Sequence, residues 1–199
     1  MTIILIGASG SGKSSIEKVL ADNYGYEKIT SYTTRPIRNG ETDGVDYNFV
    51  DHKTFSDMLE SNLFAEYDEY SQSRFYGTLK SDYADGNKVA VLTPNGFRNV
   101  KQNCKTDDIF AVLVESSLGT RIKRYIDRCG VNQFNFDDKN EIAARVERDF
   151  GMFLGMDKEV DLVIHNNEDD DIIELAKKIH ELCQTKMIEN FAEECNEDE

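Results

Sequence analysis

A glycine-rich stretch near the N-terminus constrains the fold of this chain more than any other feature. Residues 7–14 read Gly-Ala-Ser-Gly-Ser-Gly-Lys-Ser, which matches the phosphate-binding pattern of spaced glycines followed by Lys and then Ser or Thr. The apolar run at residues 2–6 predicts a buried strand, and residues 15–20 predict a helix with one apolar face. Glycines let backbone N–H groups turn toward a phosphate, and the helix N-terminus adds partial positive charge. The three parts together predict a phosphate-binding loop.

Two side chains of this loop are expected to act on the phosphates directly. The ammonium group of Lys13 should reach the outer phosphates, and the hydroxyl of Ser14 should ligate Mg²⁺. The alternative is a turn rich in glycine and serine that binds no ligand, and the flanking strand and helix argue against it.

The bulk composition excludes several classes of protein. The net charge of −15 argues against a large nucleic-acid surface, since a phosphate backbone requires a basic patch. No apolar run approaches the ~20 residues that a membrane span requires. The four cysteines are scattered and lack the Cys-x-x-Cys spacing of zinc and redox sites. This pattern favours reduced thiols in a cytoplasmic protein.

Segments typical of strands and helices alternate along the chain, which predicts an α/β fold with a largely parallel core sheet flanked by helices. Strands are expected at residues 26–32, 46–50, 88–93, 108–115 and 160–165, with a hairpin from 63–70 and 74–78. Helices are expected at residues 52–61, 95–102, 117–129, 138–152 and 170–190, with a loop at 130–135. In the helix at 52–61, Phe55, Met58 and Leu59 are expected to point inward.

The loop that follows residue 31 carries a second and longer motif. Its members are charged, aromatic or turn-forming residues at short intervals, namely Thr33-Thr34-Arg35-Pro36, Arg38, Gly40-Glu41, Asp43-Gly44 and Asp46-Tyr47. This pattern resembles the signature of the guanylate kinase family, at that family's usual distance after the phosphate-binding loop. Further matches at Glu66, residues 75–78 and residues 163–166 extend the resemblance over nearly the whole chain.

The resemblance implies a P-loop nucleoside monophosphate kinase that moves the γ-phosphoryl group of Mg·ATP to GMP or dGMP. The residues implied to bind ATP are Gly7, Ala8, Ser9, Gly10, Ser11, Gly12, Lys13, Ser14 and, at the adenine edge, Asn166. The residues implied to bind GMP are Ser31, Arg35, Arg38, Tyr47, Glu66, Tyr76 and Thr78. The residues implied to be catalytic are Lys13, Arg35, Arg124, Arg128 and Arg145, and Ser14 is the implied ligand of Mg²⁺.

These residue types suit the implied roles. Arginine offers a planar fork that matches phosphate oxygens, and tyrosine adds a neutral donor. Glu66 would accept hydrogen bonds from N1–H and N2–H₂ of guanine, with Ser31 and Thr78 on the O6 side. The three arginines between residues 124 and 145 would close over the phosphates as a lid and exclude water.

The resemblance also implies how a single domain is divided. The core is expected at residues 1–33, 82–118 and 160–199, the GMP-binding insert at 34–81 and the lid at 119–159. Two departures from the family pattern accompany this division. Val91 and Thr93 stand where the family has aspartates, and the lid loop is longer by about six residues, which costs little closure entropy.

Two other functions remain open at this stage. Another small-molecule kinase on the same scaffold, such as a ribose 1,5-bisphosphate kinase, would keep the phosphate-binding loop but has no use for Glu66. A weakly active or non-catalytic guanylate-kinase-like binding module would fit the missing aspartates but not the intact loop. A monomer and a homodimer are equally compatible with the sequence.

Overall fold

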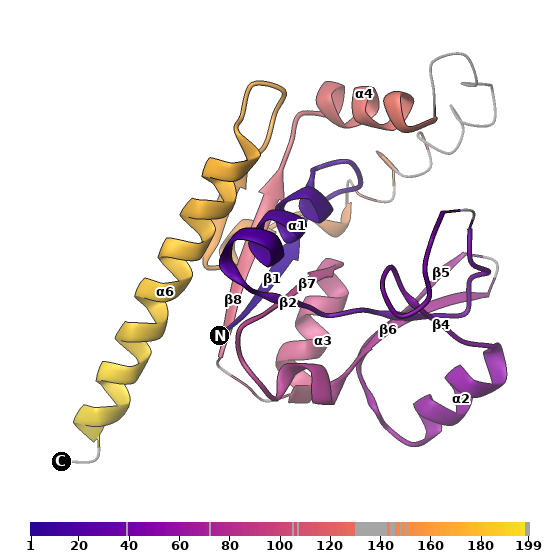
Figure 1. The fold of residues 1–199 in the computed structure, drawn as a ribbon, viewed down its shortest axis with the longest axis horizontal. Helices are drawn as coiled ribbons and strands as arrows, with labels where there is room; N and C mark the ends of the chain where they lie inside the picture. The colour runs from indigo at the N-terminus through magenta and orange to yellow at the C-terminus, as the bar shows by residue number, and fades with distance from the viewer. Residues whose placement is uncertain are drawn as a thin grey trace.

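The structure is a computed structural model, and Figure 1 shows its fold. It describes residues 1–38, 40–71, 73–104, 106, 108–129, 143, 146–147, 149 and 151–197. Side chains are not described for residues 70, 71, 128, 129 and 194–197. The loop expected at 130–135 and most of the helix expected at 138–152 lie outside the described residues.

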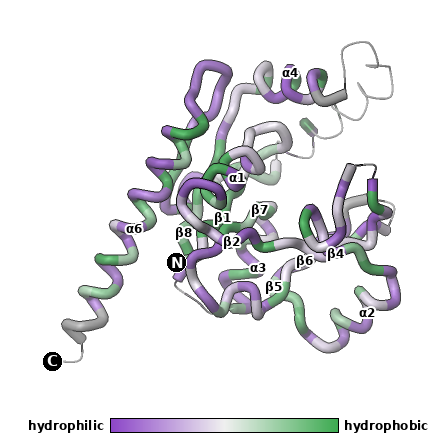
Figure 2. The backbone as a smooth tube through the Cα atoms, viewed as in Figure 1, coloured by the Kyte–Doolittle hydropathy of each residue, from purple (hydrophilic) through white to green (hydrophobic). Residues whose placement is uncertain are grey.

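Five parallel strands form the central sheet, in the order β2-β7-β1-β8-β9. Their bounds are β1 (Thr2–Ile6), β2 (Glu27–Lys28), β7 (Lys88–Leu92), β8 (Ile109–Glu115) and β9 (Leu162–His165). The middle strand β1 is buried along its whole length, as expected for a parallel strand covered on both faces. Figure 2 shows these apolar strands at the centre of the molecule. The predicted parallel core sheet is confirmed.

Helices cover both faces of the central sheet. On one face, α1 (Lys13–Tyr24) packs beside α6 (Ile172–Glu197), and on the other lies α3 (Pro94–Cys104). Because side chains alternate along a strand, Ile3 and Leu5 enter the α1–α6 cluster, whereas Ile4 and Ile6 enter the α3 cluster. The last helix runs further than the expected 170–190, to Glu197.

A second sheet of four strands stands beside the first, in the order β4-β3-β6-β5. Its strands are β3 (Tyr32–Thr33), β4 (Asn48–Phe49), β5 (Phe64–Ser71) and β6 (Arg74–Leu79). The predicted hairpin is confirmed, since β5 and β6 pair antiparallel. In contrast, β3 and β4 pair in parallel.

Helix α2 (His52–Glu60) packs against this second sheet through one residue in particular. Asp51 caps the helix by accepting a hydrogen bond from Thr54 N, and the Phe55 ring stacks on Phe64 at 4.5 Å between centroids. Phe55 is buried, as expected, and Met58 is half-buried. The inward position expected for Leu59 is wrong, because this residue is 37% exposed.

The strand expected at residues 26–32 is divided between the two sheets. Its first part is β2, and the backbone continues to pair as far as Ile29 N, which donates to Val89 O at 2.9 Å. Its last part belongs to β3. Between them the carbonyls of Thr30 and Ser31 accept from the side chain and backbone of Asn48. The chain passes from the central sheet to the second sheet at Thr30 and Ser31. Both residues are polar, unlike those of a continuous buried strand.

The remaining described elements lie between consecutive strands. A 3₁₀ turn, η1 (Lys80–Tyr83), follows β6, α4 (Leu118–Cys129) follows β8, and a second 3₁₀ turn, η2 (Met156–Lys158), precedes β9. In Figure 1, α4 lies above α1, and the second sheet lies below and to the right of it. None of the described helices combines the length and apolarity that crossing a bilayer would require.

The close packing of β5 against β6 makes a prediction at Gly77. A Cβ atom there would lie 2.8 Å from the carbonyl oxygen of Glu66 and 2.9 Å from the Phe64 ring. We expect Gly77→Ala to lower the free energy of unfolding by about 1–3 kcal/mol in urea denaturation, because backbone atoms must move. The matched control is Gly119→Ala on exposed α4, where an added methyl meets nothing closer than Ser117 Oγ at 3.9 Å. An equal loss in both variants would contradict the packing argument.

Candidate active site

The glycine loop between β1 and α1 adopts the bends that its sequence predicts. Gly10 and Gly12 have positive φ angles of 82° and 96°, where a side chain would be strained. Gly7 has no such angle, but a Cβ atom there would collide with the carbonyl of Val114 on β8. Gly12 is also the N-cap of α1, and no side chain caps this helix. The first turn of α1 is therefore left open to an anion.

Carbonyl groups in the first half of the loop accept hydrogen bonds from cationic side chains. Lys13 Nζ donates to the carbonyls of Gly7 at 2.6 Å and Ala8 at 3.0 Å. Arg121 Nε, from α4, donates to the carbonyl of Ser9 at 2.9 Å. Two positive charges thus gather at the first half of the loop, although the protein as a whole carries a net charge of −15.

The second half of the loop is held by a buried asparagine and a second arginine. Asn166, 1% exposed, donates from Nδ2 to the carbonyl of Ser11 at 2.8 Å. Arg124 donates to the carbonyl of Gly10 at 3.2 Å and also to the Asn166 side chain and the carbonyl of Asn167. The Asn166 amide is therefore occupied within the protein, and its expected contact with an adenine edge stays a prediction.

The residues around the loop could give a magnesium ion one protein ligand. Phosphate oxygens would then have to supply others. Ser14, in the first turn of α1, is exposed, and Ser11 Oγ is buried without a hydrogen-bond partner among the described residues. Within the described ranges, no three His, Cys, Asp or Glu side chains gather as a metal site. Magnesium in nucleotide sites commonly takes one or two protein ligands and completes its shell with phosphates and water. Ser14 can supply such a ligand.

A clamped arginine lies at the start of the second sheet. The guanidinium group of Arg35 forms a two-pronged pair with Glu41, at 2.8 and 2.9 Å, and is only 5% exposed. It lies 5.3 Å from the centroid of the Tyr47 ring, which meets the Tyr76 ring edge-on at 5.7 Å. The hydrogen bond from Arg35 lowers the pKa of Glu41, and the same bond raises the pKa of Arg35. Arg35, Tyr47 and Tyr76 are brought together, as the sequence predicts.

Two other residues expected in this region lie at its edge. Arg38 is exposed, and its backbone N–H donates to Glu41 at 2.7 Å. Ser31 is half-buried directly before β3. Because Tyr32 pairs with Gly77, the register brings Ser31 beside Thr78.

A buried carboxylate lies on the same sheet. Glu66 on β5 pairs with Thr78 on β6, and the Thr78 hydroxyl donates to Glu66 Oε1 at 3.0 Å. Burial raises the pKa of the Glu66 carboxyl to about 7, and the hydrogen bonds from Thr78 offset part of this effect. Tyr76 lies two residues before Thr78 and so shares its face of the sheet. Glu66, Thr78 and Tyr76, three of the residues implied to bind GMP, therefore share one face of the sheet.

The N-terminus of α3 closes the site beside Glu66. Thr93 is the N-cap of this helix, since its hydroxyl accepts from Gly96 N at 3.0 Å. A Cβ atom on Gly96 would lie 3.0 Å from Glu66 Oε2, so a larger residue there would press on the carboxylate. Val91 is part of β7. Thr93 thus has a structural task at a position where the family pattern has an acid.

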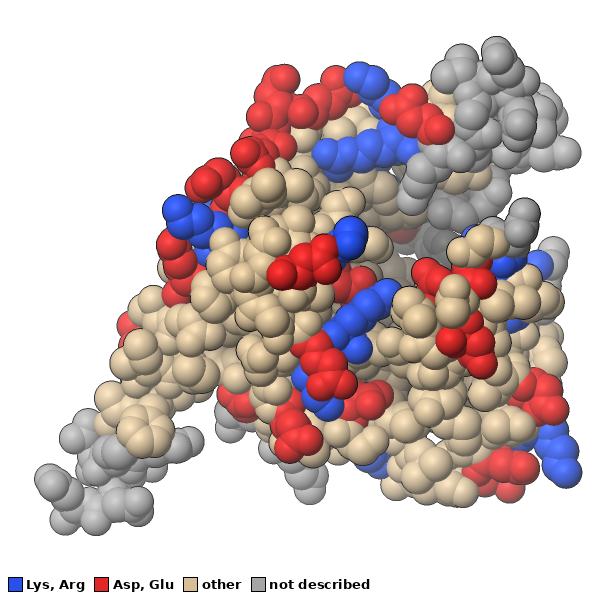
Figure 3. Space-filling model, in the orientation of Figure 1, with Lys and Arg blue, Asp and Glu red and all other residues tan. Residues whose placement is uncertain are grey.

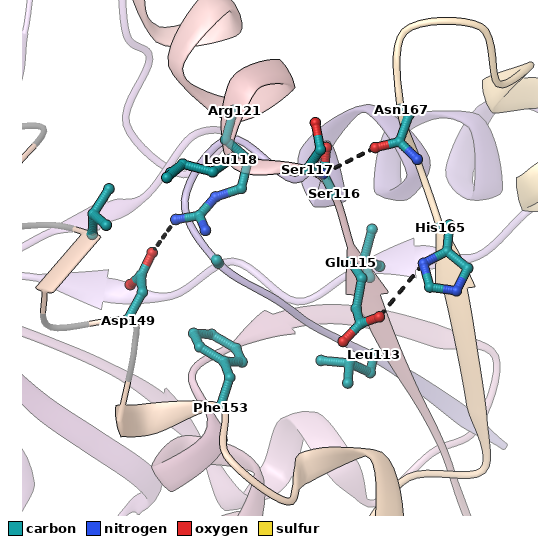
Figure 4. A pocket seen from close by; sticks show the side chains of 13 residues that line it. Leu113, Glu115, Ser116, Ser117, Leu118, Arg121, Asp149, Phe153, His165 and Asn167 are labelled. Carbon is teal, nitrogen blue, oxygen red and sulfur yellow. Dashed lines mark hydrogen bonds and ion pairs between the residues drawn. The ribbon is translucent and has the colours of Figure 1, made fainter.

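A cavity of about 600 Å³ opens beneath α4, at the carboxyl ends of β8 and β9. Figure 4 shows Arg121 and Asp149 pointing toward one another at its edge, where they form an ion pair. Glu115 and His165 form a longer contact of 3.5 Å across the strand ends. Arg121 is thus shared between the loop carbonyl of Ser9 and the segment around Asp149.

The surface charges agree with a locally cationic pocket in an acidic protein. On the face shown in Figure 3, acidic and basic side chains are interspersed, and acidic ones gather near the turn that precedes α6. That turn contains residues 168–171, which read Glu-Asp-Asp-Asp. The cations of the candidate site are Lys13, Arg121 and Arg124, which donate hydrogen bonds to carbonyls of the loop.

Some expected site residues cannot be placed, and others were not expected. Arg145 lies outside the described residues, and Arg128 is in α4 but its side chain is not described. No role follows from the sequence for Glu41, Arg121, Asp149 or Tyr83. The only sequence signal for these was at Glu41, which belongs to the quoted motif six positions after Arg35.

The parallel sheet and the glycine loop between β1 and α1 place the chain in the P-loop NTPase fold class. Comparison with known proteins then narrows the class. The guanylate kinase family model matches residues 1–182, and the chain belongs to the guanylate kinase family. The predicted family is confirmed.

Individual relatives agree with this assignment. The guanylate kinase of Mycoplasma pneumoniae is 30% identical over 175 residues, covering 84% of this chain and 70% of that protein. The guanylate kinase of Clostridioides difficile is 28% identical over 213 residues, covering 98% of this chain and 97% of that protein. The crystal structure of guanylate kinase from Anaplasma phagocytophilum has the same fold, with a TM-score of 0.63 at 22% identity, covering 93% of this chain and 86% of that one.

The buried Glu66 carboxyl makes a prediction about stability. Its pKa of about 7 in the folded protein lies above the ordinary 4.5, so stability is lost as the pH rises between these two values. We expect Glu66→Gln to raise the free energy of unfolding by about 2–4 kcal/mol at about pH 8, because glutamine mimics the neutral carboxyl. Urea denaturation at about pH 5.5 and about pH 8 measures this, and the gain should shrink at the lower pH.

The matched control is Glu69→Gln on the same strand, where the side chain is exposed. This change removes an equal charge without relieving burial, so its effect should be small at both pH values. If Glu66→Gln showed no pH-dependent gain over Glu69→Gln, the carboxyl at position 66 would not be desolvated as described.

Proposed function

We propose that the chain transfers the γ-phosphoryl group of Mg·ATP to the phosphate of GMP or dGMP, giving ADP and GDP or dGDP. Membership of the guanylate kinase family supports this proposal, as do the printed names of its relatives. The proposal extends to the division of the domain into core, GMP-binding insert and lid stated above.

The observation that carries the proposal is the buried Glu66 carboxylate, fixed by Thr78 at the side of the second sheet that also bears Tyr76. Guanine presents two adjacent donors, N1–H and N2–H₂, which suit a carboxylate. Adenine presents an unprotonated N1 at the matching edge, so the carboxylate would be left facing an acceptor. A polar site mismatched in this way can discriminate by roughly 10⁴-fold.

The acceptor phosphate is proposed to bind at Arg35, Arg38, Tyr47 and Tyr76. Glu41 keeps the Arg35 guanidinium in one orientation before any ligand arrives, because it occupies two of its prongs. Such preorganisation reduces the entropy that would be lost when a phosphate binds. Arg38 adds an exposed positive charge next to this pair.

The donor phosphates are proposed to bind in the loop of residues 7–14. Lys13, which contacts loop carbonyls here, would follow the transferred phosphoryl group, and Ser14 would ligate Mg²⁺. The ion, when bound, would neutralise charge on the β- and γ-phosphates. Arg124 is already held against the loop, and contributions from Arg128 and Arg145 are proposed from the family pattern alone.

The reaction needs little covalent help from the protein. The bond between the γ-phosphorus and the bridging oxygen of ATP breaks, and a bond to an oxygen of the GMP phosphate forms. Phosphoryl transfer of this kind depends on positioning and on stabilising the charge of the transition state. The arginines described above supply that charge in a site from which closure would exclude water.

The test is an ADP-release assay with Mg·ATP and a panel of acceptors: GMP, dGMP, AMP, UMP and ribose 1,5-bisphosphate. We expect turnover with GMP or dGMP, and Lys13→Ala should lower kcat by about 10²–10³ because it removes a positioned cation. The matched control is Lys18→Ala on the same helix, where the exposed ammonium pairs with Asp22.

Other outcomes would favour one of the alternative functions or contradict the role of Lys13. Turnover of ribose 1,5-bisphosphate without GMP would favour the alternative kinase on the same scaffold. Absence of ATP binding in calorimetry would favour a non-catalytic binding module. Unchanged turnover in Lys13→Ala would contradict the role given to this lysine.

A second prediction concerns the selectivity of Glu66. We expect Glu66→Gln to lower kcat/KM for GMP by about 100-fold or more, because glutamine presents a donor where guanine also presents donors. The KM for ATP should not change, since Glu66 lies on the second sheet and the loop lies on the first. Glu69→Gln is again the control. Equal losses for GMP and ATP would show that Glu66 does not read the base.

A further inference from the structure

Three side chains form a buried line of hydrogen bonds behind the proposed base-reading site. The Tyr83 hydroxyl lies 2.9 Å from Thr78 Oγ1, and Thr78 Oγ1 donates to Glu66 Oε1 at 3.0 Å. Their exposed fractions are 5%, 1% and 7% in that order. The line begins on η1, crosses β6 and ends on β5.

The direction of these bonds follows from the number of protons. When Glu66 is ionised its carboxylate can only accept, so the single hydroxyl proton of Thr78 is used on Glu66, as the structure has it. Thr78 must then accept from its other neighbour, and the Tyr83 hydroxyl is therefore the donor. Tyr83 thus determines where the proton of Thr78 points.

The ring of Tyr83 is well placed to hold this direction. It packs in the apolar cluster that α3 forms with the central sheet, beside Phe97 and Val100. The turn that carries it is fixed by Asp82, whose carboxylate accepts from Leu79 N at 2.9 Å. A buried tyrosine hydroxyl normally finds a partner, and here that partner is Thr78.

We propose that Tyr83 is a positioning residue for acceptor recognition, which holds the Thr78 hydroxyl on Oε1 of Glu66 so that the carboxylate meets the donor edge of guanine in one orientation. This inference rests on the proposed function and deepens it. It also changes the role expected of Thr78, whose proton is not free for guanine O6. Ser31, beside Thr78 in the register, is then the hydroxyl left for that oxygen.

The charges around Glu66 explain why this bond matters. The Thr78 hydrogen bonds lower the pKa of Glu66, while burial and the charge of Asp68 on the same strand raise it. Tyr83 itself is surrounded by Glu66, Asp82 on its own turn and Cys104 on α3, and burial raises the pKa of its hydroxyl. If the Thr78 hydroxyl turned away, Glu66 would become harder to ionise near neutral pH.

The test is Tyr83→Phe in the full chain, which removes the hydroxyl and keeps the ring. We expect the KM for GMP to rise about tenfold, with no change in the KM for ATP, since one charge-assisted bond is weakened. The acid limb of kcat/KM for GMP should also move to higher pH. A purely structural role for the tyrosine would not move that limb.

The matched control is Tyr26→Phe, which removes another buried hydroxyl on the opposite face of the sheet. Tyr26 is 3% exposed and its hydroxyl lies 3.2 Å from His180 Nδ1. We expect this variant to keep both KM values and the pH profile of the unmodified chain. A matching rise in the KM for GMP in Tyr26→Phe would mean that general destabilisation causes the effect.

A double-mutant cycle separates this inference from the proposed function. In a Glu66→Gln background, Tyr83→Phe should add little further loss for GMP, because the carboxylate it orients is gone. Full additivity, or an unchanged KM and pH limb in Tyr83→Phe alone, would overturn the inference. Absence of GMP turnover in the unmodified chain would instead overturn the proposed function.

Discussion

The structure depends on how one loop disposes of its carbonyl groups. The carbonyls of residues 7–11 each accept a hydrogen bond from a side chain, and those donors come from α1, from α4 and from the turn after β9. A buried carbonyl left without a donor would cost about 1–3 kcal/mol. Because the C=O and N–H of a peptide unit point in opposite directions, fixing each carbonyl also fixes the direction of the N–H group in the same peptide unit. The loop is therefore shaped only when elements as distant as residues 13 and 166 have assembled around it.

The second sheet carries a buried negative charge, whereas cationic side chains bond to the loop. It keeps a carboxylate in a place where burial disfavours charge, and the partner it gives that carboxylate, Thr78, is neutral. A group that weakens the folded state in this way is more readily explained by recognition than by packing. Arg35 is treated differently, since Glu41 neutralises it in place. A purine monophosphate has an uncharged base and a charged phosphate. The base would meet Glu66, whose partner is a neutral hydroxyl, and the phosphate would meet Arg35, whose partner is a carboxylate.

Local patterns in the sequence predicted those parts of the fold that local patterns determine. The sequence patterns of the loop, of its flanking strand and helix, and of the hairpin of β5 and β6 each lie within a short stretch of residues. The division of residues 26–32 between two sheets could not be read there, because it depends on Asn48 capturing the carbonyl of Thr30. Arg121 appeared as one of several cations on a helix, and its contact with Ser9 joins residues that are 112 positions apart. No local pattern distinguishes Tyr83, since only the folded chain brings its hydroxyl to Thr78.

The guanidinium group of Arg121 bonds the carbonyl of Ser9 and the carboxylate of Asp149 at the same time. Loss of the Asp149 contact would leave Arg121 without this counter-charge while it still bonds the loop. By thermodynamic linkage, any effect of the Arg121–Asp149 pair on the affinity of the loop for an anion would be matched by an equal effect of the anion on that pair. Arg121 therefore connects the phosphate-binding loop to Asp149 through one side chain.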